Sequence, residues 1–115
     1  MLNNSSIEPY RHDLEVIRNT VLQIKKDFSI FNFEITFSGN ETTAYPELKT
    51  QLVAIFKDLL RNHSERVFAL LYRIDVPESK LKKVPPSVLI EEHIAELVLE
   101  RELLKVVMRK LYSGK

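Results

Sequence analysis

The sequence predicts a mainly α-helical, four-helix bundle-like single domain, and three observations support this. Residues 87–112 form a long run without glycine or proline that is rich in good helix formers. In several stretches apolar residues recur at intervals of three and four, which is the spacing of one helix face. The chain of 115 residues contains two glycines and no tryptophan, which favours helices over a turn-rich β fold.

The first predicted helix covers residues 9–28. Its apolar residues keep alternating spacings of four and three, and they are Leu14, Ile17, Val21, Ile24 and Phe28. The polar residues before it, 1–8, are expected to form a flexible N-terminus. The single helical domain is therefore expected to span residues 9–115.

Residues 29–44 have a different pattern. Apolar side chains at Phe31, Phe33, Ile35 and Phe37 alternate with polar ones, which predicts one short extended or β segment near 31–37. No second strand is evident in the sequence. A lone strand must pair with a copy of itself across a dimer or lie as extended chain over the helices.

Two further helices are predicted at 44–62 and 64–76. The first has a clean apolar face, whereas the second is apolar most of the way round. A helix that is apolar on all sides belongs in the interior, so we expect 64–76 to be the most buried element. Pro77 stops it, and residues 77–86 are linker-like.

The long helix at 87–112, with Ser87 as its N-cap, has two apolar faces. The broad face carries Ile90, Ile94, Leu97, Leu104, Met108 and Leu111, and the narrow one carries Val88, Ala95, Leu99, Leu103 and Val106. We expect the broad face to supply the core through Ile94, Leu97, Leu104 and Met108. Two faces imply cover on both sides, either at the centre of the fold or against another chain.

Assembly is predicted from the length of this helix. It is longer than its neighbours and should overhang them, which would expose a contiguous apolar surface. We therefore expect a homodimer in which the long helix contributes to the interface. The candidate interface residues are Leu99, Arg101, Leu103 and Val106.

No catalytic, cofactor-binding or metal-binding motif is visible. His93 and Glu96 lie one helical turn apart on a glutamate-rich stretch, but this pair is expected to be a solvated polar face. The carboxylate-bundle pattern of di-iron proteins needs Glu-x-x-His on two helices and is absent. Both glycines, Gly39 and Gly114, stand alone, so no phosphate-binding loop is formed.

Three charged residues fall within otherwise apolar patterns: Arg73, Asp75 and Arg101. Buried charges need partners. One interpretation is that they make structural ion pairs. The other is that they surround a polar pocket that binds an anionic ligand.

These observations favour a non-enzymatic interaction module that forms a homodimer or contacts another protein. The alternative is a small ligand-binding or enzymatic domain with a polar pocket around Arg73, Asp75 and Arg101. A net charge of +1 gives no reason to expect nucleic acid or a membrane surface as a partner, although lysines in 80–83 could contact phosphates. No cofactor is expected. A polar N-terminus without a signal peptide favours a cytoplasmic location, and the absence of cysteine excludes disulfides.

Overall fold

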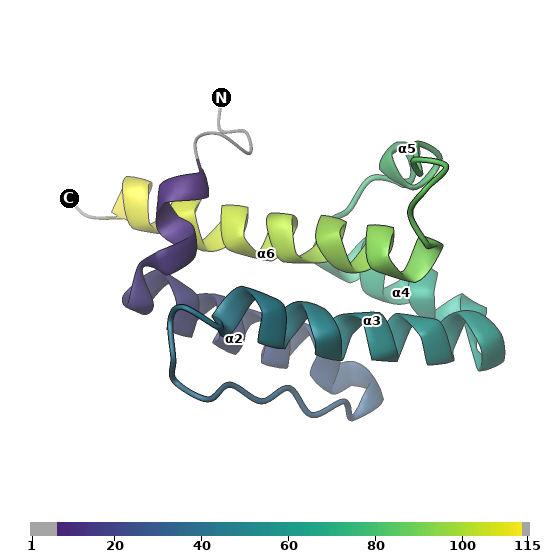
Figure 1. The fold of residues 1–115 in the computed structure, drawn as a ribbon, viewed down its shortest axis with the longest axis horizontal. Helices are drawn as coiled ribbons and strands as arrows, with labels where there is room; N and C mark the ends of the chain where they lie inside the picture. Colours follow the sequence, from purple (N-terminus) through teal and green to yellow (C-terminus); the bar gives the residue numbers. More distant parts are fainter. Residues whose placement is uncertain (1–6, 114–115) are drawn as a thin grey trace.

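The computed structural model describes residues 7–113 and confirms a mainly α fold (Figure 1). Between residues 7 and 113 it contains helices and no β-strand. In chain order the elements are the 3-10 helix η1 (Glu8–His12), α2 (Leu14–Phe28), the 3-10 helix η2 (Ser29–Phe31), α3 (Ala44–Asn62), α4 (Ser64–Ile74), α5 (Glu78–Leu81) and α6 (Ile90–Ser113).

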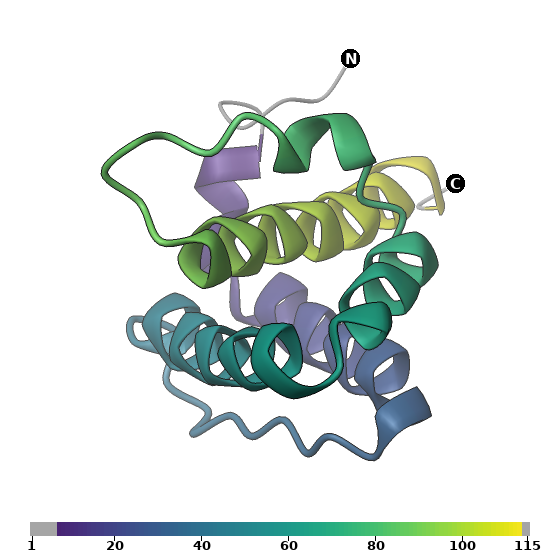
Figure 2. The same ribbon diagram turned by 90° about the vertical axis from the view of Figure 1, so that its right-hand side faces the viewer.

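Helix α6 is the central element of a molecule that measures 43 × 29 × 25 Å. Figure 2 shows α2, α3 and α4 gathered on one side of α6, while α5 and η1 lie on the other side. The two apolar faces of α6 are therefore both covered, at least in part, by segments of the same chain. This is the first of the two arrangements expected from the sequence, with the long helix at the centre of the fold.

The face of α6 that builds the core is the narrow one, so the predicted choice of face was largely wrong. Ile94 is buried as expected, but Leu97 and Leu104 are only half-buried, and Met108 is 40% exposed. The side chains that α6 buries are those of Ile94, Ala95, Val98, Leu99, Glu102, Leu103, Val106 and Val107. Of the broad face, only Ile94 and Leu97 lie in or against the main cluster, whereas Ile90, Met108 and Leu111 are exposed.

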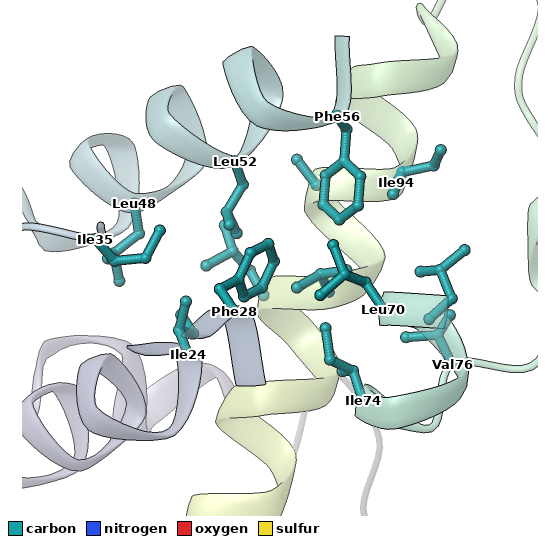
Figure 3. Packing of buried hydrophobic residues seen from close by; sticks show 14 of the residues in the cluster. Ile24, Phe28, Ile35, Leu48, Leu52, Phe56, Leu70, Ile74, Val76 and Ile94 are labelled. Carbon is teal, nitrogen blue, oxygen red and sulfur yellow. The ribbon is translucent and has the colours of Figure 1, made fainter. Parts of the chain in front are cut away.

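Two hydrophobic clusters hold the helices together. In the main cluster the rings of Phe28 and Phe56 meet edge to face, with centroids 5.9 Å apart, between Leu52 and Leu70 (Figure 3). The second cluster lies along the C-terminal half of α6 and comprises Ile7, Val16, Leu103, Val106 and Val107. Because this second cluster covers the half of α6 that was expected to overhang, most of that apolar surface is buried within the chain.

Of the predicted helix boundaries, those of 44–62 are confirmed, whereas 9–28 and 64–76 differ from the structure. Helix α3 spans the predicted residues 44–62. The predicted helix 9–28 is broken at Asp13, whose backbone is extended and whose Oδ1 accepts a hydrogen bond from the Val16 N–H at 3.2 Å, which makes it the N-cap of α2. Helix α4 ends at Ile74 because Asp75 adopts a left-handed conformation with φ of 73°.

The start of the long helix also differs from the prediction. Ser87 lies in a turn and not at an N-cap, and α6 begins at Ile90. The predicted linker 77–86 contains the short helix α5. The His93 imidazole Nε2 lies 2.9 Å from the Lys80 carbonyl oxygen and connects α5 to α6.

Of the predicted segment near 31–37, residues 33–37 are extended over the helices but form no β-strand, whereas Phe31 belongs to η2 and Asn32 to a turn. Its side chains alternate as predicted, with Ile35 buried and Thr36 exposed. The Thr36 N–H donates to Gln51 Oε1 at 2.8 Å, and Gln51 Nε2 donates to the Thr36 carbonyl oxygen at 2.9 Å. This primary amide from α3 does what a neighbouring strand would do, so the segment needs no strand from a second copy.

The predicted flexible N-terminus, residues 1–8, is described in part by the structure. Residues 1–6 of the predicted flexible N-terminus lie outside the described residues, whereas Ile7 is buried in the second cluster. Among the helices of residues 7–113, none is long and apolar enough to cross a membrane.

Candidate functional site

The predicted interface residues do not lie together on the surface. Leu99, Leu103 and Val106 are buried within their own chain, against α2, α3 and Ile7. Only Arg101 of the four reaches the surface, where its Nη2 lies 2.9 Å from Asp75 Oδ2. The four residues therefore form no continuous patch on the surface of a single chain, because the narrow face of α6 points inward.

The three charged residues of the expected polar pocket are engaged in ion pairs. Arg101 pairs with Asp75, and Arg73 Nε lies 3.4 Å from Asp27 Oδ1. These pairs tie the C-terminal end of α4 to α6 and to α2. Any anionic ligand at this place would have to compete with carboxylates for both arginines.

A buried charge cluster lies where α2, α4 and α6 meet, and sequence reasoning missed its centre. Glu102 has no exposed surface, and Asp27 is buried beside it. Lys105 Nζ lies 2.8 Å from Glu102 Oε1 and 3.3 Å from Asp27 Oδ2. Gln23 Nε2 donates to Asp27 Oδ2 at 3.0 Å. Within residues 7–113, neither oxygen of Glu102 makes a hydrogen bond of good geometry.

The two carboxyl groups are driven to opposite protonation states. Burial raises the pKa of Glu102 to about 8, the neighbouring Asp27 adds to the rise, and Lys105 opposes it. Burial would also raise the pKa of Asp27, but interactions with the side chains of Glu102, Gln23 and Lys105 outweigh it and lower that pKa. At neutral pH the cluster therefore holds a protonated Glu102 against an ionised Asp27.

The burial of Glu102 could have been predicted from its position in the sequence. It falls in the narrow apolar stripe of α6, with Leu99 three residues before it and Val106 four after it. A carboxyl group in such a stripe must be buried if that stripe faces the core. Asp27 carried no comparable signal, because its burial depends on the position of α6.

The His93 and Glu96 pair does not converge on one site. The His93 ring contacts the Lys80 carbonyl group. Glu96 accepts a hydrogen bond from the Tyr45 hydroxyl group and lies 3.1 Å from Lys49 Nζ through Oε2. Among the described residues, no group of three or more histidine, aspartate and glutamate side chains is arranged to hold a metal ion.

The outer side of α4 exposes apolar surface that the sequence led us to expect inside. Phe68 is 54% exposed and Tyr72 is 82% exposed. They line a groove of about 440 Å³ together with Leu71, Asp75, Val76 and Glu78. Phe68 and Tyr72 are exposed because α4 lies at the periphery of the bundle and not at its centre, as Figure 2 shows. The prediction that α4 is the most buried element was wrong.

A second groove of about 580 Å³ runs between α2 and the C-terminal half of α6. Its lining is mixed and includes Leu22, Gln23, Lys26, Arg109 and Lys110. Lys110 Nζ lies 3.3 Å from Asp13 Oδ2, and Arg109 Nη2 donates to Gln23 Oε1 at 2.9 Å. Lys110 and Arg109 of α6 are thus paired with groups at the start of α2 and along it.

Comparison of the chain with protein-family models, with curated proteins and with solved structures gave no match.

Proposed function

We propose that the protein is a non-enzymatic helical interaction module that works as a homodimer. The observation that supports this proposal is the outer side of α4. Helix α4 is apolar most of the way round, but its neighbours lie on its inner side only, and it presents Phe68 and Tyr72 to solvent.

Two aromatic side chains one helical turn apart are suited to a protein contact. Aromatic residues are enriched at interfaces and account for a large share of their binding energy, because they bury much area with few rotatable bonds. The groove beside them is also lined by Leu71 and Val76, which are buried. The exposed apolar residues at the end of α6, among them Met108, Leu111 and Tyr112, lie on a different element and offer a competing contact surface.

The alternative function, a ligand-binding or enzymatic domain around Arg73, Asp75 and Arg101, has less support. Both arginines are already paired with carboxylates. Glu102, whose pKa is raised by burial, has no exposed surface. A catalytic acid must reach its substrate directly or through one water molecule.

Light scattering coupled to size-exclusion chromatography tests the homodimer, with loading concentrations from low micromolar to near millimolar. The expected result is a molar mass that rises toward twice the chain mass as concentration increases. A monomer mass over the whole range would contradict the proposal. A thermal-shift screen with small anions tests the alternative, since a bound ligand would raise the melting temperature.

A further inference from the structure

The outer positions of α4 form a short self-complementary pattern. Inward-facing residues alternate along the helix with a set that is exposed to solvent: Glu65, Phe68, Ala69, Tyr72 and Arg73. Ala69 is the smallest of these and lies at the middle of the set. Glu65 precedes it by one helical turn and Arg73 follows it by one helical turn, so opposite charges flank the centre symmetrically.

This symmetry has a consequence for two copies of the helix. If two α4 helices cross antiparallel with the two-fold axis passing at Ala69, Glu65 of each copy faces Arg73 of the other, and the same ion pair forms twice. The small side chain of Ala69 allows the axes to come within about 8 Å, the close end of the usual range. Phe68 and Tyr72 then lie beside the crossing and are buried by it.

The charged groups around this face are compatible with that pairing. The Glu65 carboxylate lies 3.5 Å from His63 Nδ1 and is otherwise exposed. Arg73 uses Nε toward Asp27 at 3.4 Å, and the fork of a guanidinium group has further N–H donors. On the flank of α4 toward η2, Arg66 stacks over Phe31 at 5.0 Å and faces its own chain.

We infer that the occupant of this face is a second copy of the chain, held by an antiparallel α4–α4 crossing near Ala69 with reciprocal Glu65–Arg73 pairs. The inference rests on the proposed homodimer and assigns the surface that forms it. Because the charge pattern is symmetric about Ala69, it is complementary to itself in the antiparallel arrangement, which favours a second copy as the occupant.

Cysteine cross-linking tests the position of the axis directly, because the chain has no cysteine of its own. A residue on a two-fold axis meets its own copy, and a disulfide forms when the two Cα atoms are roughly 4.4–6.8 Å apart. Ala69→Cys should form a covalent dimer rapidly under mild oxidation. Ala54→Cys, an exposed alanine on α3, is the matched control and should form one at least about tenfold more slowly.

A paired substitution tests the aromatic contact. Tyr72→Glu should raise the dimer dissociation constant at least about tenfold, whereas Tyr112→Glu, at a similarly exposed tyrosine on α6, should leave it within about twofold. Circular dichroism should show unchanged helix in both variants. If the wild-type chain is a dimer but both cysteine variants cross-link equally and Tyr72→Glu remains dimeric, the α4 crossing is refuted while the homodimer stands. A wild-type monomer at all concentrations refutes both.

Discussion

Glu102 lies in the interior because it shares the narrow face of α6 with apolar side chains that are buried. Leu99, Leu103 and Val106 can be buried only if the stripe faces the core, and the carboxyl group is carried in with them. A buried carboxylate is expensive unless it is well paired, so this group keeps its proton and lies against Asp27 and Lys105.

The proton on Glu102 makes stability depend on pH. The folded state holds it up to about pH 8, whereas an unfolded chain releases it near the ordinary glutamate pKa of about 4.3. Between these values the folded state binds more protons, so the free energy of unfolding should fall as pH rises, by up to about 1.4 kcal/mol per pH unit. Asp27 acts in the opposite sense at acid pH, because its lowered pKa stabilises the fold only while it is ionised.

Glu102→Gln should remove this slope and stabilise the protein at alkaline pH, because an amide can donate to Asp27 without titrating. Urea unfolding from about pH 5 to about pH 9 measures the slope directly. Glu34→Gln, at an exposed position, is the control and should keep the wild-type slope. Equal slopes in wild type and Glu102→Gln would show that Glu102 does not hold the proton.

Two leucines on α6 report which of its faces supports the core. Leu99→Ala should lower the free energy of unfolding by about 2–5 kcal/mol, as truncation of a buried leucine does. Leu111→Ala, on the exposed end of the broad face, should lower it by less than about 1 kcal/mol. The two variants are compared by urea unfolding, and a larger loss at Leu111 would reverse the assignment of the faces.

At the scale of single elements, the sequence predicted those helices whose faces are unambiguous. Helix α3 has one apolar stripe and sharp end signals, and its predicted bounds agree with the structure. Helix α6 has two stripes, and local periodicity cannot decide which one faces inward. That choice depends on tertiary packing, because α2, α3 and Ile7 lie against the narrow stripe. The candidate interface residues on the narrow stripe were misplaced for the same reason.

The extended part of the segment near 31–37 shows a second limit of prediction from local patterns. Its alternation correctly predicted which side chains point inward, but not what satisfies its backbone. Two solutions were expected, a strand pairing with a second copy or an extended path over the helices. The structure has the second, and the Gln51 side chain bonds its backbone at Thr36. No periodic pattern can reveal such a tertiary hydrogen bond, because it joins residues fifteen positions apart.

Loss of this glutamine should loosen the segment without unfolding the bundle. Gln51→Ala is expected to lower stability by about 1–2 kcal/mol, the value of two modest hydrogen bonds, and to speed exchange of the Thr36 amide hydrogen. Thr50→Ala, at the exposed neighbour on α3, should leave that exchange unchanged. Wild-type exchange at Thr36 in Gln51→Ala would mean that the amide pairing does not hold the segment.

For the whole molecule, the main consequence of placing α6 at the centre is the position of α4. Because α6 is the element with neighbours on both sides, α4 is left at the edge with apolar residues on its outer face. The apolar pattern of 64–76 led us to expect this helix in the interior, and the structure places it at the edge. The sequence could not show that Phe68 and Tyr72 would remain exposed, because their exposure depends on how the helices pack and not on α4 alone.

Hydroxyl-radical footprinting at low and high protein concentration tests most directly whether α4 forms the contact between copies. Tyr72 and Tyr112 are exposed to similar extents, at 82% and 72%, and each lies on one of the two competing surfaces. We predict that modification of Tyr72 falls steeply as the protein is concentrated, while that of Tyr112 stays constant. Protection of Tyr112 with Tyr72 unchanged would place the contact on α6 and contradict the account.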